Sequence, residues 1–439
     1  MQTPDNNTKT EEYSDQHYIG HVTAMSATHN IYTRSSISTQ TGIKLIKEGV
    51  RITPGFYEQL TKHKLLKPID ESITIENGID LIRIFSDIEK VLVDDPFFEI
   101  FKSAISTLQP IITGFSEEEL PAQITLKLTV MANQLPDLYQ HSLQVVLVCA
   151  YFGVKLDFTE QAMKALVCSA LLHDIGELHI DASIASRSGV LDKNGFNQLY
   201  AHPVIANLIL SKFKYYKHGV CRAIMEHHER MDGSGYPKGL QNEQISEAGY
   251  ILAIAEFFTG LYQKYSESNS ANHLRIILSF QNSKFPEKFL KILSGGIASD
   301  KSRHSHKQDS LKQESLQTKL FTLGHVLQDW NKMNNYLKTE SSRLEERQLA
   351  ELVNKRLYEL HQGILSLGVE IDATKEFIDM LAENADDLLE VQMIAQEIQY
   401  QLNALILEVQ RRWPNSEFDN SPYHQIKIWI QHIDNTFFS

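Results

Sequence analysis

The chain has 439 residues, which is enough for two or three domains, and its 42% hydrophobic and 22% charged residues are ordinary for a soluble globular protein. A net charge of -13 argues against a surface for a nucleic-acid polymer, because phosphate contacts need clustered Lys and Arg. No stretch approaches the roughly 18 unbroken apolar residues of a membrane span, and the N-terminus lacks the apolar core of a signal peptide. The three widely spaced cysteines indicate buried free thiols of a reducing cytoplasm.

The first third of the chain predicts a small module and a connector. Residues 1–20 are expected to be a disordered tail, and residues 21–80 a small α+β module with strands over 31–37 and 65–69. Within it, Thr53 and Pro54 are typical of a helix start. Residues 81–120 are expected to be a helical connector, with one amphipathic helix over 81–112.

The middle of the chain has a helical period throughout and predicts an all-helical domain over residues 121–297. The expected helices are Pro136–Phe152, Thr159–His173, Lys193–His202, His218–His228, Glu247–Tyr265, Leu274–Leu278 and Pro286–Leu293. A polar linker is expected over 298–316 and a C-terminal helical domain over 317–439.

Two heptad seams mark the C-terminal helices. The longer is Leu388, Val391, Ala395, Ile398, Leu402, Leu405 and Val409, and the shorter is Val353, Leu357, Leu360, Ile364 and Leu367. Such seams are typical either of a helical hairpin packed within its own domain or of a coiled coil between two copies. A homodimer is one expectation and the hairpin is its alternative.

Histidines and carboxylates gather in the middle domain where a helix face or a helix end can present them. The candidates are Asp137, His141, His173, Asp174, His202, His227, His228 and Glu256. Taken singly, most have an ordinary explanation: Asp137 suits the first turn of a helix, and a single His often caps a helix or lies in a core. Five clusters within 120 residues are better explained by metal binding. Glu256 lies in an apolar run, and buried carboxylates are normally paired or bound to metal.

The spacing favours more than one metal ion. Adjacent residues on a helix point about 100° apart, so His173-Asp174 and His227-His228 cannot each chelate one ion as a simple pair. They suit a site in which each pair serves two ions or a carboxylate bridges both. Mixed imidazole and carboxylate ligands favour iron, manganese or zinc over calcium. Such a cluster activates water and clamps a phosphate.

Two strings resemble the HD-GYP family of the HD phosphohydrolase superfamily. They are Leu-Leu-His-Asp-Ile-Gly-Glu-Leu over 171–178 and His-His-Glu-Arg-Met-Asp-Gly-Ser-Gly-Tyr-Pro over 227–237. The resemblance covers about two-fifths of the chain. It implies a mainly α fold, with an all-helical HD-GYP domain between the α+β module and the C-terminal hairpin or coiled coil. It also implies two or three iron or manganese ions, zinc being less expected, and hydrolysis of cyclic di-GMP to the linear dinucleotide or GMP.

The family pattern also assigns roles to residues of this chain. The metal ligands it implies are Asp137, His141, His173, Asp174, His202, His227, His228 and Glu256. A hydroxide held by His173 and Asp174 with their partners would be the nucleophile. Gly233, Gly235, Tyr236 and Pro237 would shape the substrate rim and contact GGDEF-type or other signalling proteins.

The sequence departs from the family pattern at several positions. Glu177 stands where the family usually has a phosphate-binding Lys, Tyr250 where an Arg is usual, and Glu256 where the last ligand is usually Asp. The Arg-x-Tyr segment of the family is not recognisable over 260–268. At roughly 5 Å and an effective dielectric of 20, the charge inversion at Glu177 could cost phosphate binding up to about 6 kcal/mol before screening.

Three functions are therefore compatible with the sequence. The first is an active cyclic di-GMP phosphodiesterase, with Glu177 a catalytic-site residue of altered charge. The second is a degenerate domain that binds metal or nucleotide and acts as a sensor or scaffold. The third is a hydrolase of another phosphate ester, because the HD scaffold serves many substrates.

Overall fold

The structure is a computed structural model that describes residues 15–185, 193–264, 271–298, 330, 344–366 and 385–412. The chain divides into two compact units, Met1–Gly260 and Leu261–Ser439, and each is described by itself. The described residues are mainly α-helical with two small two-stranded sheets, which confirms the predicted fold class. Residues 1–14 of the predicted tail and residues 299–316 of the predicted linker lie outside the described residues. The division falls within the predicted domain 121–297, and the predicted boundaries stay predictions.

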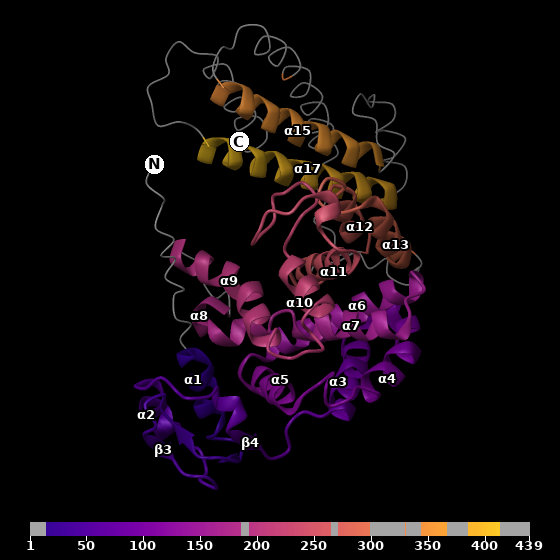
Figure 1. Cartoon of the computed structure of the whole chain (residues 1–439). Helices are drawn as coiled ribbons and strands as arrows, with labels where there is room; N and C mark the ends of the chain where they lie inside the picture. The colour runs from indigo at the N-terminus through magenta and orange to yellow at the C-terminus, as the bar shows by residue number, and fades with distance from the viewer. Residues whose placement is uncertain are drawn as a thin grey trace. The chain divides into compact units, whose positions relative to one another are not determined.

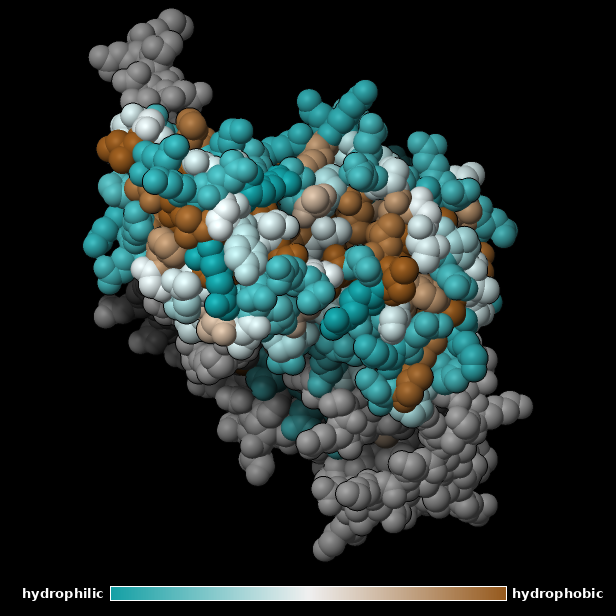
Figure 2. All heavy atoms as spheres, turned by 90° about the horizontal axis from the view of Figure 1, so that it is seen from below, coloured by the Kyte–Doolittle hydropathy of each residue, from teal (hydrophilic) through white to brown (hydrophobic). Residues whose placement is uncertain are grey.

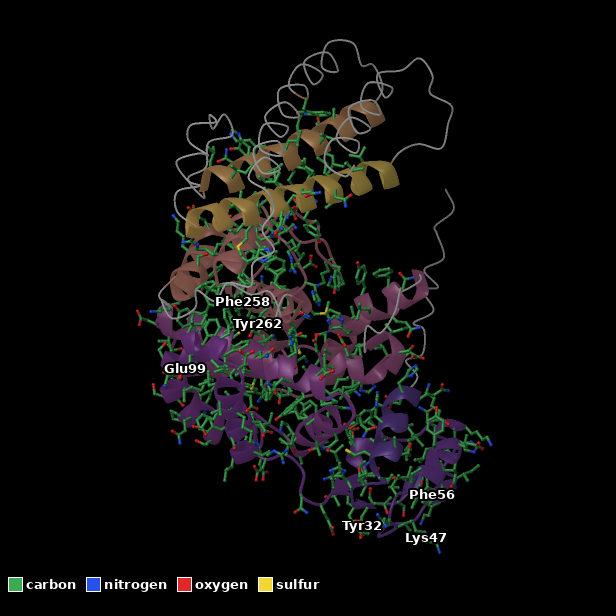
Figure 3. All side chains as sticks on the ribbon, turned by 180° about the vertical axis from the view of Figure 1, so that it is seen from behind. Tyr32, Lys47, Phe56, Glu99, Phe258 and Tyr262 are labelled. Carbon is green, nitrogen blue, oxygen red and sulfur yellow. The ribbon has the colours of Figure 1, made fainter. Side chains whose placement is uncertain are left out.

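The first unit begins with a small α+β module, marked by Tyr32, Lys47 and Phe56 in Figure 3. Its elements are α1 (Gln16–Met25), β1 (Ile31–Thr33), β2 (Ile37–Ser38), β3 (Lys44–Ile46), η1 (Pro54–Phe56), α2 (Tyr57–Thr61), η2 (Ile69–Glu71) and β4 (Ile73–Ile75). Strand β1 pairs with β4 and β2 pairs with β3, both antiparallel.

Three sequence predictions in this module were wrong. The predicted strand over 31–37 is divided into β1 and β2, which belong to different sheets. Residues 16–20 belong to helix α1 rather than to a disordered tail, because Tyr18 and Ile19 are buried in the module. Residues 65–69 do not form a strand: Leu65 makes only an isolated bridge with Thr39, and Ile69 begins a 3-10 helix. Pro68 supplies no amide donor, which prevents a continuous ladder there.

The predicted helix over 81–112 is divided into α3 (Leu81–Asp94), η3 (Pro96–Ala104) and α4 (Ile105–Thr113). The break lies at Asp95, whose φ of -130° and ψ of 95° are extended, as expected for a residue before proline. Phe97, Phe98 and Phe101 of η3 are buried, and Phe97 and Phe101 pack on Phe258, which is labelled in Figure 3. The segment is therefore part of the core and not a simple connector.

The helical body of the first unit follows (Figure 1). Its elements are α5 (Ala122–Gln134), α6 (Pro136–Lys155), α7 (Glu160–Leu172), η4 (Ile175–His179), α8 (Ala182–Ala185), α9 (Lys193–Leu210), α10 (Gly219–Glu226), η5 (Asn242–Gln244) and α11 (Glu247–Lys264). The expected helices are confirmed with ends shifted by a few residues, except that α9 does not end at His202. It continues through Pro203 for seven more residues, to Leu210. The three cysteines are free and buried, as predicted.

The second unit contains α12 (Ala271–Ser279), α13 (Glu287–Ala298), α15 (Leu344–Ser366) and α17 (Ala385–Arg412). Helices α15 and α17 lie side by side, and α17 also contacts α12 (Figure 1). The seam residues whose side chains are described are all buried, namely Val353, Leu357, Leu360, Ile364, Ala395, Ile398, Leu402, Leu405 and Val409. Leu367 and the side chains of Leu388 and Val391 lie outside the described residues. Packing within one chain therefore buries the described part of both seams, as the hairpin alternative expects.

On the face shown in Figure 2, apolar side chains appear in patches among hydrophilic ones. Every helix in the described part of the chain is too short or too polar to cross a membrane.

Candidate metal centre

Five helices of the first unit bring seven of the eight predicted ligands together. These are His141 in α6, His173 and Asp174 after α7, His202 in α9, His227 and His228 after α10, and Glu256 in α11. Their potential ligand atoms form two groups, and within each group these atoms lie within 4.8 Å of one another. The first group is Asp174, His202, His227 and His228, and the second is His141, His173, Asp174 and Glu256. Asp174 belongs to both groups, as a carboxylate that bridges two ions would.

Three of the histidines are oriented by the same kind of hydrogen bond to the backbone. The Nδ1 atom of His173 lies 2.8 Å from the carbonyl oxygen of Ala170, that of His202 2.6 Å from Leu199, and that of His227 2.5 Å from Ile224. In each case the carbonyl belongs to the residue three positions earlier. A carbonyl can only accept, so Nδ1 carries the proton and Nε2 of the neutral ring presents a lone pair to the site. This backbone anchor is typical of metal-binding histidines.

Each of these carbonyls is available for a structural reason. The last four carbonyls of a helix have no intrahelical partner, and Ala170 and Ile224 lie in the last turns of α7 and α10. Leu199 lies four residues before Pro203, which has no N–H to donate to it. The prediction that the helix ends before Pro203 was therefore wrong, but the proline has a consequence at the site. It leaves the carbonyl of Leu199 free to orient His202.

The histidine Nε2 atoms and the Asp174 oxygens that face one another in the two groups require a cation between them. The Nε2 atoms of His202 and His227 are 3.1 Å apart, and two bare lone pairs repel at that distance. His173 Nε2 lies 3.1 Å from Asp174 Oδ2 and His202 Nε2 3.2 Å from Asp174 Oδ1, yet neither buried oxygen has a well-formed hydrogen bond. Lone pairs and carboxylate oxygens that face one another in a buried space fit divalent metal ions of borderline softness.

The electrostatics of the groups agree with that fit. Burial opposes the charge on Asp174, but His173 and His202 hold the pKa of this carboxyl well below its usual value. Burial also opposes the charge on Glu256, but His141 and His173 hold its pKa well below the usual value. Burial alone would lower the pKa of His173, yet the charge of Asp174 raises it well above normal. Burial lowers the pKa of His227 to about 3. The groups thus hold ionised carboxylates and attract positive charge, as protons or as metal ions.

Close packing of glycine brings the two sides of the centre together. A Cβ atom at Gly176 would lie 2.2 Å from the carbonyl oxygen of His202, so only glycine lets η4 approach α9 this closely. Asp174 directly precedes η4, and the approach places it beside His202. In the sequence Gly176 is only one residue of the 171–178 string, and its packing role could not be predicted from local pattern.

The predicted rim loop lies against the first group. The ring of Tyr236 stacks on His228 with centroids 4.5 Å apart, and a Cβ at Gly235 would lie 2.4 Å from the carbonyl oxygen of His228. Gly233 has a φ of +78°, which favours glycine. The carboxylate of Glu229 accepts hydrogen bonds from the backbone amides of Lys238 (2.7 Å) and Leu240 (2.8 Å) and so ties down the loop that contains Pro237. Nothing in the local sequence pattern had indicated this role for Glu229.

Three positions that the sequence singled out, Asp137, Glu177 and Tyr250, belong to neither ligand group. Asp137 is exposed in the first turn of α6 and belongs to neither group, so a third metal ion at Asp137 stays a prediction. Glu177 is fully buried in η4, and its charge is one of those that raise the pKa of His202 against the effect of burial. Tyr250, where the family usually has Arg, donates its hydroxyl to the carbonyl oxygen of Asn242 at 2.7 Å and supports η5.

Comparison with known proteins points to the same segment. Residues 127–285 match the HD domain family. A 3′3′-cGAMP-specific phosphodiesterase 1 of Vibrio cholerae is 31% identical over 38% of this chain and 40% of its own length. The cyclic di-GMP phosphodiesterase PdeB of Borreliella burgdorferi is 27% identical over 36% of this chain and 42% of its own. This chain thus covers less than half of these two relatives.

A solved structure is also similar, Bd1817, a HDG"Y"P protein from Bdellovibrio bacteriovorus. It is 16% identical, with 61% of this chain and 93% of that chain covered and a TM-score of 0.34. HD-domain phosphohydrolases bind divalent metals, and both candidate groups lie within the matched segment. Residues 127–285 of this chain are thus similar to the HD domain family, and the two strings noted in the sequence resemble its HD-GYP branch.

Proposed function

We propose that this chain is a metal-dependent phosphodiesterase that hydrolyses cyclic di-GMP to the linear dinucleotide or GMP. The observation that carries the proposal is the shared carboxylate, because Asp174 lies in both four-residue groups. Two bound ions, iron or manganese, would supply activated water and neutralise charge on the phosphate. Asp174 and Glu256 would hold them with the Nε2 atoms of the histidines. The rim loop from Gly233 to Pro237 would position the substrate.

The names of the relatives support a cyclic dinucleotide and leave two choices of base. One relative is named for cyclic di-GMP and another for 3′3′-cGAMP. The direct test is to load the purified chain with manganese or iron and to follow linear products from both cyclic dinucleotides. We expect turnover of cyclic di-GMP and loss of it in Asp174→Asn. Absence of hydrolysis by protein that carries two metal ions would contradict the proposal.

A second candidate function is favoured by one observation. Glu177 replaces a family Lys and is fully buried beside the first group, where a carboxylate repels phosphate. Such a site could bind nucleotide without hydrolysing it and act as a sensor or scaffold. Binding of cyclic di-GMP without turnover by the metal-loaded protein would favour this function.

Replacing Glu177 by Lys tests the role of that charge. We expect Glu177→Lys to increase turnover of cyclic di-GMP, because a cation is restored near the phosphate without removing any member of the two groups. Glu177→Gln is the matched control, since it removes the negative charge and should give a smaller increase. A fall in both activity and metal content would instead mean that Glu177 holds a metal ion.

Protein partners remain proposals. The rim loop could contact GGDEF-type or other signalling proteins, since it lies at the edge of the centre. A homodimer through the heptad seams is less well supported, because their described residues are already buried within one chain. Light scattering of the full chain would decide: a monomeric mass is expected if the seams serve only the hairpin.

A further inference from the structure

A stack of three rings runs outward from the first ligand group. His228 stacks on Tyr236 with centroids 4.5 Å apart and ring planes 19° apart, and Tyr236 stacks on Tyr200 at 4.2 Å and 22°. Phe196 continues the series at 6.0 Å from Tyr200, with a tilted ring. The inner end of the stack is thus a candidate metal ligand, and its outer end is a pair of aromatic rings on α9.

The outer rings are exposed. Tyr200 is 46% exposed and Phe196 45% exposed, and they lie four residues apart on one face of α9. Single exposed aromatic residues are common on protein surfaces, but here two adjacent ones adjoin a ligand group. Tyr200 also precedes His202 by only two residues, so the backbone of the same helix holds both.

We propose that Tyr200, with Phe196 beside it, is the platform on which one nucleobase of the substrate stacks. This inference rests on the proposed cyclic dinucleotide phosphodiesterase activity and adds a substrate-positioning residue to it. A nucleotide carries its base one sugar away from its phosphate, so a phosphate at the ligand groups brings a base toward the neighbouring rim. Stacking on aromatic side chains is a common way to hold a base whose phosphate is bound elsewhere.

The platform is held in place before the substrate arrives. One face of Tyr236 is covered by His228 and the other by Tyr200, and the amide of Tyr236 donates to the carbonyl oxygen of His228 at 3.2 Å. Tyr200 therefore rests on a ring that is itself fixed to the centre. Binding a base then requires little further ordering of the side chains, which favours affinity.

Stacking also predicts how the platform treats different substrates. Every nucleobase has a π-face, so Tyr200 should add affinity for cyclic di-GMP and for 3′3′-cGAMP alike. It should add nothing for a phosphodiester whose only ring is attached directly to the phosphate. Comparison of these substrates separates the platform from the phosphate-binding part of the site.

The test compares Tyr200→Ala and Tyr200→Phe with Tyr358→Ala. Tyr358 is a matched control because it is an exposed helical tyrosine (63% exposed) in α15 of the other unit. The measured quantity is the ratio of kcat/KM for cyclic di-GMP to kcat/KM for methyl 4-nitrophenyl phosphate, in the metal-loaded full chain. We expect Tyr200→Ala to lower this ratio about tenfold through KM, since base stacking on an aromatic residue is worth about that much. Tyr200→Phe should retain most of the ratio, and Tyr358→Ala all of it.

A second measurement keeps the inference testable if turnover is absent. A cyclic dinucleotide with 2-aminopurine in place of one base loses fluorescence when that base stacks. We expect quenching on binding to the native chain and to Tyr200→Phe, and little with Tyr200→Ala. If the native chain hydrolyses methyl 4-nitrophenyl phosphate but not cyclic di-GMP, the proposed function fails, while this quenching still decides the role of Tyr200.

Several results would overturn the platform. An unchanged ratio and equal quenching in Tyr200→Ala would show that no base stacks there. An equal fall for both phosphodiesters would mean that Tyr200 only supports the ligand groups through Tyr236. A change in molar mass by light scattering with an unchanged ratio would mean that this face of α9 binds another protein molecule.

Discussion

Two polar clusters, buried except for the partly exposed Asp15, lie at the two ends of η4 and balance their charge in different ways. At one end, His179 Nε2 lies 3.3 Å from Lys127 Nζ, Lys127 pairs with Asp70 at 3.4 Å, and Asp15 lies 3.2 Å from His179 Nδ1. Lys127 also lies 3.5 Å from the ring centroid of Tyr18. We call these five residues the lysine cluster. It contains its own cation.

At the other end, Asp174 precedes η4 and joins the two ligand groups. Among the described residues, the ion-pair partners found for Asp174 and Glu256 are histidines only. His173 and His202 donate their Nδ1–H groups to the backbone, so their neutral rings have no proton at Nε2. Each can attract a carboxylate through Nε2 only if that atom takes up a proton or binds a metal ion that the carboxylate also binds. Buried carboxylates therefore indicate a metal site where no described Lys or Arg forms an ion pair with them, and a structural cluster where one does.

The largest expected effect concerns the lysine cluster. Lys127→Met should lower the free energy of unfolding by about 3–5 kcal/mol, because it leaves Asp70 buried without its cation. Urea unfolding followed by circular dichroism measures this. Lys102→Met is the matched control: Lys102 is 68% exposed in its pair with Glu99, so its loss should cost less than about 1 kcal/mol. Loss of bound metal in Lys127→Met would break the comparison, because the two clusters would then not be independent.

A smaller effect concerns the proline in α9. Pro203→Ala restores an N–H that competes for the carbonyl of Leu199, so we expect metal affinity to fall about 10- to 100-fold. The same change should raise the stability of metal-free protein, since proline inside a helix costs a hydrogen bond. Metal titration and urea unfolding measure the two effects. Val204→Ala, one residue later on α9, is the control, and unchanged metal affinity in Pro203→Ala would contradict the backbone anchor.

The smallest effect is a pH dependence within the lysine cluster. Burial and the charge of Lys127 lower the pKa of His179 from 6.5 to about 4. Between these values the unfolded chain binds a proton at His179 that the folded chain does not, so this residue makes stability fall as pH falls. We expect His179→Gln to reduce that slope by at most about 1.4 kcal/mol per pH unit. Equal slopes for the two proteins between pH 6.5 and pH 4 would show that His179 keeps its ordinary pKa when folded.

Local pattern in the sequence singled out the seven residues that the structure brings into the two groups, because each one lies at a helix end or on a helix face. Adjacent pairs such as His173-Asp174 also implied two ions, and the structure places Asp174 in both groups. The same pattern could not show whether Asp137 shares a metal ion with His141, because a shared helix face does not guarantee a shared site.

The contacts between distant segments could not be predicted in this way. The lysine cluster joins residues 15 and 18 to residues 70, 127 and 179, and nothing local marks these three segments and His179 as neighbours. The stack of Tyr200 on Tyr236 likewise depends on how α9 meets the rim loop. Local rules placed the end of this helix at His202, whereas α9 continues through Pro203 and packs on η4.

The number of metal ions per chain tests the central claim most directly. Elemental analysis of anaerobically prepared protein, reconstituted with iron or manganese, should find at least two ions per chain. Asp174→Asn should bind fewer than one, because it alters the carboxylate that both groups share. One equivalent or fewer in the native chain, or two in Asp174→Asn, would contradict the account of two ion sites joined by one carboxylate.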